Sequence, residues 1–276
     1  MGLMEQGMPS NIEGTLDVPL SHTGAGVMAA PEEAALGTSA LTAQRGTESN
    51  AAIPHPGTKA FEDACRALDR RPFGYRIAKR AFDIAFSTVI IAVGLVPCAL
   101  LSVAIAFDTM GSPIYTQERV GRLGRPFRIF KFRSMVADAD DVEKYLTSAQ
   151  LAQWERERKV DDDPRVTRLG RVLRRTSLDE LPQFLNVLAG QLSVIGPRAI
   201  TYDELREYGS DAPLLLSVPQ GITGVWQAGP RNEATFENGE RQEIELGYAC
   251  HANLYEDARV FGATFGAMFG KRRSGR

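Results

Sequence analysis

The chain has 276 residues, of which 43% are hydrophobic and 24% charged, so at least part of it can bury a core. Its net charge of −2 and its isoelectric point of about 6.0 argue against nucleic acid as a partner. The three cysteines, Cys65, Cys98 and Cys250, are widely spaced and odd in number, which excludes a disulfide framework. The three histidines lack metal-ligand spacing, so no zinc site is expected.

The two ends of the chain have the composition of tails. Residues 1–60 are rich in Gly, Ala, Thr, Ser and Pro and show no sustained helical or strand period. Such a segment cannot bury enough apolar area to offset its chain entropy, so we predict a disordered tail. It also lacks the basic start and apolar core of a secretory signal. Residues 271–276 (KRRSGR) form a short basic tail.

A long apolar segment follows a short predicted helix that starts near Phe61 and stops before Pro72. Residues 82–107 carry a single charge, that of Asp83 near their start. As a helix, these 26 residues would measure about 39 Å at about 1.5 Å per residue, against about 30 Å for a hydrocarbon core. The sequence therefore predicts a membrane helix, with burial in a soluble core as the alternative.

Two features complicate a simple membrane span. Pro97 stands near the middle of the segment, where it removes a backbone hydrogen bond and predicts a kink. Basic residues flank both ends, so the positive-inside rule gives no orientation. They are Arg76, Lys79 and Arg80 before the segment, and Arg119, Arg122 and Arg125 after it. A helix that enters, bends and returns satisfies both features, although physical reasoning alone favours a span because single spans are commoner.

The remainder of the chain reads as α+β, mostly helical with one β-hairpin. Short runs of β-branched and aromatic residues on either side of GRLGR, between residues 113 and 135, predict the hairpin. Charged or amphipathic patterns predict the helices. They cover residues 138–159, a stretch from about Leu178 to Gly190, residues 201–208 and residues 243–269.

Two basic stretches contain no acidic residue. Residues 119–133 hold six cations and residues 165–175 hold five arginines, so charge is segregated in a chain of net charge −2. Such stretches suit a surface that lies against anionic lipid headgroups. They equally suit a pocket for phosphate groups, which arginine contacts in a bidentate manner. Residue types alone leave the two readings balanced.

Asp179 and Glu180 follow the second basic stretch directly. Pro182 is tolerated only in the first turn of a helix, so both carboxylates are expected at a positive helix end. Ser177 and Glu180 fit a capping box, which is the purely structural alternative. Arg174 and Arg175 should keep the acids ionised, as a nucleophile or a metal ligand requires. Two carboxylates hold Mg²⁺ only with help from water or substrate phosphates.

Several motifs occur together in one order. They are K-R-x-x-D from Lys79 to Asp83, Q-E-R-V-G at 117–121, K-F-R-S-M at 131–135, D-P-R-V-T at 163–167, R-R-T-S-L-D-E-L-P-Q at 174–183, N-V-L at 186–188 and G-P-R at 196–198. With an apolar, proline-containing segment after the first motif, this pattern resembles the bacterial sugar transferase family, the monotopic phosphoglycosyl transferases. The resemblance covers about residues 76–265. The chain shows no N-terminal multi-span region, which makes it similar to the small forms that prime exopolysaccharide synthesis.

The resemblance implies a re-entrant helix and a specific reaction. Hexose-1-phosphate would pass from a UDP-sugar to undecaprenyl phosphate, with Mg²⁺, on the cytoplasmic face of the bacterial inner membrane. By resemblance, Asp179 is the covalent nucleophile and Glu180 helps to bind the metal. Both residues are expected to be metal ligands. The expected phosphate or substrate contacts are Lys131, Arg133, Arg174, Arg175, Arg198 and Arg231. The expected lipid-interface residues are Lys79, Arg80, Asp83 and Pro97.

The expected domains follow from these assignments. They are a tail at 1–60, a juxtamembrane and re-entrant segment at 61–110, a cytoplasmic catalytic domain at 111–270 and a basic tail at 271–276. A homo-oligomer is a further expectation. Ala199, Gln220 and Pro230 depart from the family pattern, and Val96 stands where some members have Ser before the proline. These departures leave the donor hexose undetermined, and galactose or glucose is favoured by the resemblance only. A membrane-bound adaptor without catalytic activity, which binds anionic lipid or a polysaccharide-assembly partner, is the competing hypothesis.

Overall fold

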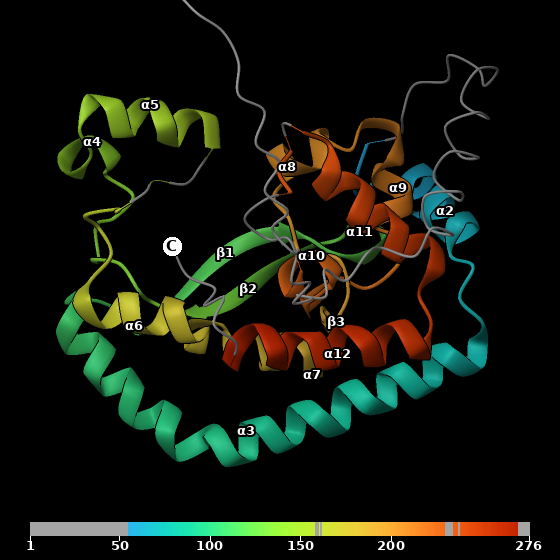
Figure 1. Ribbon diagram of the computed structural model, residues 1–276, viewed down its shortest axis with the longest axis horizontal. Helices are drawn as coiled ribbons and strands as arrows, with labels where there is room; N and C mark the ends of the chain where they lie inside the picture. Colours follow the sequence, from blue (N-terminus) through green and yellow to red (C-terminus); the bar gives the residue numbers. More distant parts are fainter. Residues whose placement is uncertain (1–54, 158–159, 161, 230–233, 237, 270–276) are drawn as a thin grey trace, which may run out of the picture. The chain divides into compact units, whose positions relative to one another are not determined.

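The computed structural model describes residues 55–157, 160, 162–229, 234–236 and 238–269 (Figure 1). Nearly all of the expected N-terminal tail, the whole basic tail and Arg231 therefore lie outside the described residues. The first described helix, α2 (Lys59–Leu68), starts where Thr58 Oγ1 accepts the N–H of Phe61. Phe61 and Cys65 are buried on its inner face, which confirms the short helix predicted near Phe61.

The predicted hairpin is confirmed. Strands β1 (Ile114–Val120) and β2 (Pro126–Phe132) pair antiparallel, with Ile114 opposite Phe132. The 3-10 turn η2 (Arg122–Gly124) connects them. A second sheet was not expected from the sequence. It consists of β3 (Ser193–Ile195) and β4 (Gly221–Thr223), which pair parallel although 25 residues separate them in the chain.

Three of the predicted helices are each divided in the structure. The helix expected from about Leu178 to Gly190 is instead the 3-10 turn η3 (Leu178–Glu180) followed by α7 (Gln183–Leu188). The expected helix at 138–159 is instead α4 (Val142–Tyr145) and α5 (Ser148–Glu157), because Asp141 caps a short first helix that ends before Leu146. The expected helix at 243–269 is instead α11 (Glu240–His251) and α12 (Leu254–Phe269). Asn253 separates them, since its Oδ1 accepts the N–H groups of Tyr255 and Glu256 at the start of α12.

The other elements are short. They are α6 (Arg168–Thr176), α8 (Tyr202–Arg206), the 3-10 turn η4 (Gly209–Asp211), α9 (Ala212–Leu215) and α10 (Val225–Ala228). Helix α8 lies within the helix predicted at 201–208, and Thr201 and Glu204 form a capping box at its start. The structure is therefore mostly helical with a small antiparallel hairpin, as expected.

Three apolar clusters form the interior. The largest joins the hairpin to α7, β3, α11 and α12, with Ile129, Val187 and Val260 among its buried members. A second cluster holds Phe61 of α2 against Ile200 and the α9 region. A third is small and joins Ile105 of α3 to the strand β2 and to α6.

Helix α3 (Phe73–Thr109) contains the long apolar segment. It is long and apolar enough to cross a membrane, and its most apolar 18-residue window has a mean hydropathy of 2.7. Only 6% of that window is buried, so the alternative of burial in a soluble core is wrong. The helix continues through Pro97 without interruption, and no break is seen there. Figure 1 shows that the ribbon of α3 changes direction partway along, and a proline inside a helix is a known cause of bending.

Both halves of α3 contact the same domain. In the first half, Phe86 and Ile90 pack against the largest cluster, and α3 lies against α7 and β3. In the second half, Ile105 is fully buried against Phe132 and Leu173. Much of the apolar surface between these contacts, including Val93 and Leu100, stays exposed.

Lys79 and Asp83, expected at the lipid interface, are instead buried inside the protein. Lys79 and Asp83 are each only 4% exposed, so the expectation that they meet lipid headgroups needs correction. Lys79 Nζ lies 2.8 Å from Asp257 Oδ2 on α12, and Asp83 accepts hydrogen bonds from Ser193 Oγ and the Val194 N–H. These charges are buried because each meets a partner that replaces its hydration. They attach α3 to the domain.

Arg80 likewise bonds within the protein. Its guanidinium donates to the carbonyl oxygens of Val187, at 2.6 Å, and Leu188, at 2.9 Å. These carbonyls end α7, where a cation is favoured by the helix dipole. The chain then turns at Gly190, whose φ of +78° falls in the left-handed region.

Candidate active site

The Asp179–Glu180 pair is carried by a tight turn between two helices. Helix α6 ends at Ser177, whose φ of 56° reverses the chain direction, and the N–H of Ser177 bonds to the carbonyl of Arg174. The 3-10 turn η3 follows at once. The Ser177 side chain makes no capping bond, so the capping box proposed as the structural alternative is absent. The two carboxylates are presented by the turn rather than used to cap a helix.

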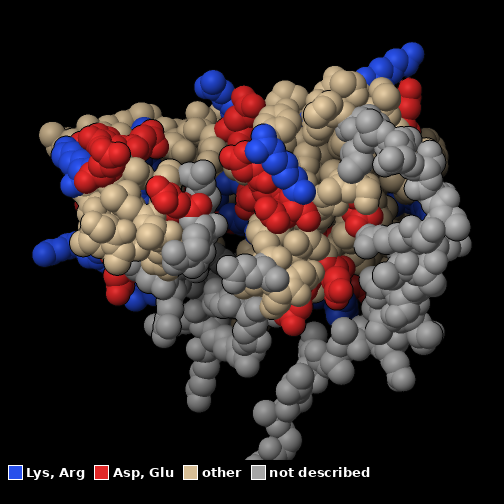
Figure 2. Space-filling model, turned by 90° about the horizontal axis from the view of Figure 1, so that it is seen from above, with Lys and Arg blue, Asp and Glu red and all other residues tan. Residues whose placement is uncertain are grey.

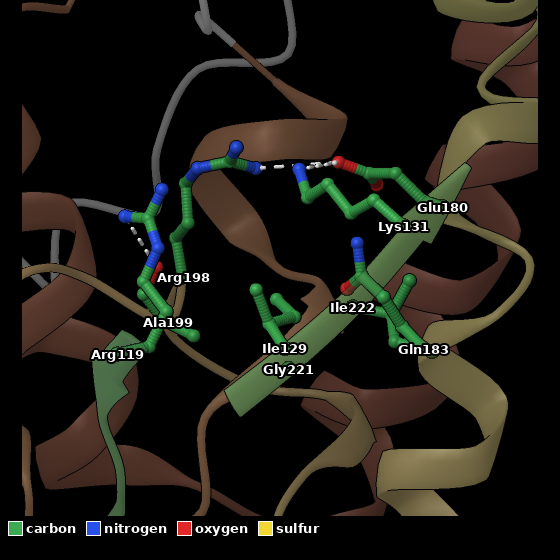
Figure 3. Close-up of a pocket in the computed structure, with 9 residues that line it drawn as sticks. All are labelled: Arg119, Ile129, Lys131, Glu180, Gln183, Arg198, Ala199, Gly221 and Ile222. Carbon is green, nitrogen blue, oxygen red and sulfur yellow. Dashed lines mark hydrogen bonds and ion pairs between the residues drawn. The ribbon is translucent and has the colours of Figure 1, made fainter. Parts of the chain in front are cut away.

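Glu180 faces two cations from other elements. Its Oε1 lies 3.2 Å from Lys131 Nζ on β2 and 3.8 Å from an Nη atom of Arg198, which follows β3. Figure 3 shows these three side chains pointing toward one another across the pocket. Sequence segments separated by up to 67 residues therefore meet at one carboxylate.

The pocket has an apolar floor and polar walls. Ile129 and Ile222 lie at its base, with Gln183 beside them (Figure 3). The lining residues are Arg119, Ile129, Lys131, Glu180, Gln183, Arg198, Ala199, Gly221 and Ile222. Three of them are cations and one is an acid, so the charge of the lining favours an anionic group such as a phosphate.

The charged groups around Asp179 shift one another's pKa. Burial raises the pKa of Asp179 above its ordinary value and the Glu180 carboxylate adds to this, while Lys131 and Arg174 oppose it. The net direction is upward, and of the two arginines expected to favour the ionised acids, Arg174 opposes the shift. Burial lowers the pKa of Lys131, although Glu180 and Asp179 counteract the loss of its charge. Partial desolvation strengthens every charge interaction in the pocket.

Arg119 was not selected as a site residue from the sequence. Its Nη1 lies 2.9 Å from Glu204 Oε2 and 3.3 Å from the carbonyl oxygen of Ala199, and its Nη2 donates to Gln117. These bonds hold the guanidinium at the wall opposite Glu180 (Figure 3). The Q-E-R-V-G motif was the available signal, but Glu204 lies 85 residues further along the chain.

The Gly-Pro-Arg turn is supported from behind by a buried acid. The backbone N–H of Arg198 donates to Glu245 Oε1 at 3.1 Å, and the Tyr208 hydroxyl donates to Glu245 Oε2. Burial raises the pKa of Glu245, while nearby Arg241 stabilises its charged form. Gly196 permits the turn, because a Cβ there would lie 2.3 Å from the carbonyl oxygen of Pro219. The position of the Arg198 side chain therefore depends on Glu245 and Gly196.

The other expected substrate residues divide into two groups. Arg174 lies near Asp179, and its Nε donates to Ser134 Oγ at 2.9 Å. Arg133 follows the end of β2 and donates to the carbonyl oxygens of Ser112 and Ala137, so the structure does not bring it into the pocket. Arg175 is exposed and does not line the pocket either.

A metal ion would find two adjacent carboxylates here. Among the described residues, no group of three or more His, Cys, Asp or Glu side chains is placed to hold a metal. Mg²⁺ is commonly bound by one or two carboxylates together with substrate phosphates and water. Asp179 and Glu180 therefore fit Mg²⁺ that arrives with a phosphate ligand. They do not fit a metal site built from protein ligands alone.

Comparison with known proteins gives three informative relatives. The UDP-galactose-lipid carrier transferase of Erwinia amylovora is 37% identical over 196 residues, which cover 70% of this chain and 40% of that protein. The undecaprenyl-phosphate galactose phosphotransferase of Salmonella typhimurium is 39% identical over 188 residues, which cover 67% and 39%. The exopolysaccharide production protein ExoY of Sinorhizobium fredii is 37% identical over 202 residues, which cover 72% and 88%.

The similarity thus spans about two fifths of the first two relatives and most of the third. The family model described as bacterial sugar transferase matches residues 74–271, which include α3 and every element that lines the pocket. With a match over more than half of its length, the chain belongs to the bacterial sugar transferase family.

Proposed function

We propose that the protein transfers hexose-1-phosphate from a UDP-sugar to undecaprenyl phosphate and thereby primes the synthesis of exopolysaccharide or another surface glycan. The observation that carries the proposal is the placement of Asp179 and Glu180 among Lys131, Arg174 and Arg198. Two relatives support this proposal, because their names describe transfer that involves galactose and a lipid carrier or undecaprenyl phosphate.

The first step is attack by an Asp179 carboxylate oxygen on the β-phosphorus of the UDP-sugar. The bond from that phosphorus to the bridging oxygen breaks, and UMP leaves with the electron pair. The product is an aspartyl-phosphosugar. Lys131 and Arg198 stabilise the negative charge that spreads over the phosphoryl oxygens, because they are held in place before the reaction begins.

The second step regenerates the enzyme. A phosphate oxygen of undecaprenyl phosphate attacks the same phosphorus, the Asp179–phosphorus bond breaks, and Asp179 leaves as a carboxylate. Two steps let one small pocket serve a soluble donor and a lipid acceptor in turn. A raised pKa makes the carboxylate more basic than an ordinary aspartate, while Lys131 and Arg174 favour its charged form.

Mg²⁺ is part of the proposal. Glu180 and Asp179 would hold it together with donor phosphate oxygens, and it would neutralise diphosphate charge when bound. The protein's own cations keep their roles, since Lys131 reaches Glu180 from β2 and Arg198 reaches it from the facing side of the pocket (Figure 3).

The packing of α3 supports a re-entrant arrangement in the membrane. Both halves of this helix contact one domain, so a helix that enters the membrane and returns to the same side satisfies the contacts without moving the domain. Leu181, next to Glu180, packs against both clusters to which α3 contributes. We therefore place the site at the lipid boundary, on the cytoplasmic face of the bacterial inner membrane.

The charged side chains on the face that carries α5 and α8 are consistent with this placement of α3 in the membrane (Figure 2). Figure 2 looks onto the side that α5 and α8 occupy in Figure 1, and basic and acidic side chains of both signs are spread over it. Such a surface suits water, whereas the exposed apolar side chains of α3 suit lipid.

The test is a donor panel. Membrane fractions that contain the protein are incubated with undecaprenyl phosphate and UDP-galactose, UDP-glucose or their N-acetylated forms, and UMP release is followed. We expect release with one hexose donor, dependent on undecaprenyl phosphate and on Mg²⁺. Absence of UMP release with every donor, from folded protein, would contradict the proposed reaction.

A further inference from the structure

A second concave site lies at the start of α3, apart from the candidate active site. It is a groove of about 550 Å³, within the range of small-molecule sites. The first turns of α3 form one wall, and residues 190–192 and Arg122 of η2 contribute to the others. It shares no lining residue with the pocket around Glu180.

The groove carries an excess of positive charge. Five of its lining residues are cations and one, Asp83, is an acid. The cations are Arg71, Arg76, Lys79, Arg80 and Arg122. Lys79 is paired with Asp257, and Arg80 is committed to the carbonyls at the end of α7.

Two of the remaining three arginines share one acidic partner, Asp69. Arg71 and Arg122 both bind Asp69, at 2.8 Å each. Arg76 is exposed and forms no ion pair with a described residue. Burial lowers the pKa of Arg122, and the charges of Arg71 and Arg76 lower it further while Asp69 raises it, so both arginines lie close enough to Arg122 to act on its charge. An anion in the groove would relieve the repulsion between these cations.

The same groove is lined by exposed apolar side chains. Phe73, Ile77 and Ile84 of α3 lie among its lining residues, and all three are exposed. They precede the exposed apolar surface of the rest of the helix. A free inorganic anion would use the arginines only. An anion with acyl chains would use both kinds of surface.

We propose that this groove binds an anionic membrane phospholipid, with its phosphate at Arg76 and Arg122 and its acyl chains along α3, while Arg71 stays in its bidentate pair with Asp69 and adds positive charge nearby. The ligand holds the first turns of α3 at the depth of the headgroups. Arginine suits this task because it contacts phosphate in a bidentate manner and stays charged.

Native mass spectrometry of the full chain in detergent tests the proposal. The probes are phosphatidylglycerol and phosphatidylcholine with identical acyl chains, each titrated separately. We expect tighter binding of phosphatidylglycerol, and about fivefold weaker binding of it by Arg76→Ala, as the loss of one cation near an anionic headgroup implies. The matched control is Arg206→Ala on α8, where the side chain is 81% exposed and outside the groove. This control should bind as the unchanged chain does.

Two further measurements separate the sources of the phosphate group. Inorganic phosphate at millimolar concentration should not displace phosphatidylglycerol, and Phe73→Ser should weaken lipid binding with Arg76 intact. Displacement by inorganic phosphate would show a site for free anions and overturn the proposal. Equal binding of the two lipids, or equal effects of Arg76→Ala and Arg206→Ala, would overturn it as well.

Discussion

Lys131 Nζ lies 3.2 Å from Glu180 Oε1, and this contact joins the β-hairpin to the turn that carries the two acids. Both side chains are mostly removed from solvent, with 18% and 22% of their surface exposed. Removal of one partner would therefore leave a poorly solvated charge in the pocket. The proposed chemistry depends on this arrangement.

Asp179→Asn should abolish transfer. Asparagine keeps the shape of the side chain but cannot form the acyl-phosphate bond, so we expect UMP release to fall by at least about a thousandfold, as is common when a nucleophile is removed. Membrane association should be unchanged, which sedimentation with membranes checks. Turnover close to that of the unchanged chain would exclude Asp179 as the nucleophile.

Asp179→Glu separates the enzyme from the adaptor hypothesis. The charge is retained but the carboxylate moves by one methylene, and misplacement of about 1 Å can cost about a hundredfold in rate. An adaptor that holds anionic lipid or a partner through its basic surface would tolerate this change. Glycan production in cells that carry only this variant is the measurement, and normal production would favour the adaptor.

Lys131→Met should lower kcat by about a hundredfold to a thousandfold, the usual cost of one preorganised electrostatic contact to the transition state. Arg133→Met is the matched control two residues further on. Its guanidinium bonds to the carbonyl oxygens of Ser112 and Ala137 and is not in the pocket. We expect kcat within about twofold of the unchanged chain for this control, because surface substitutions have small effects. Equal losses in both variants would show a general role of basic charge.

Several features were predictable because they are local. The hairpin follows from the runs of β-branched and aromatic residues on either side of GRLGR. Pro182 indicated a helix start nearby, but the helix starts after it, at Gln183, and not near Leu178 as expected. The turn at Gly190, two residues after the end of α7, follows from a glycine in the left-handed region. Each of these depends on a few neighbouring residues.

Other features depend on distant partners, which a single sequence does not reveal. Lys79 is buried because Asp257, 178 residues away, neutralises it. Without knowledge of that partner, a basic residue before an apolar helix predicts a contact with lipid headgroups. The site role of Arg119 depends on Glu204 in the same way. The parallel pair of β3 and β4 has three residues per strand, too few for a period to show.

The stability of the protein should respond to Asp179 as well. Burial and Glu180 raise the pKa of Asp179 in the folded state. A carboxyl of this kind destabilises the fold at a pH above its folded pKa, and the cost disappears as the pH falls through that pKa toward the ordinary value. Asp179→Asn should therefore unfold at a higher temperature than the unchanged chain at pH 7, by roughly 2–4 °C for each kcal/mol relieved. Thermal unfolding in detergent should show this difference shrink as the pH falls toward the ordinary aspartate pKa of about 4 and vanish below it; a constant difference would contradict the raised pKa.

Gly196→Ala should unfold or severely destabilise the domain. A Cβ at this position would lie 2.3 Å from the Pro219 carbonyl oxygen and 2.9 Å from the Gly221 backbone nitrogen, and backbone atoms cannot move aside as a flexible side chain can. The parallel pair of β3 and β4 would separate and Arg198 would leave the pocket. Gly247→Ala in α11 is the control, since a Cβ there meets nothing within 4 Å and alanine favours a helix by up to about 1 kcal/mol. Similar melting temperatures for the two variants would show that the close approach at Gly196 is not needed.

The packing of both halves of α3 on one domain predicts that both ends of the helix lie on one side of the membrane. The side on which each end lies can be tested with two single-cysteine variants, Arg70→Cys and Ser112→Cys, in a chain whose native cysteines, Cys65, Cys98 and Cys250, are replaced by serine. Both positions are exposed, Arg70 before α3 and Ser112 after it. In intact spheroplasts, a membrane-impermeant maleimide should modify neither position, and after permeabilisation it should modify both. A spanning helix would place one of the two cysteines outside, so labelling of a single position in intact spheroplasts would refute the re-entrant arrangement. Because the contacts of Phe86 and Ile105 hold the two halves to the same domain, a span would have to break one of them, and the labelling pattern reports which arrangement the membrane selects.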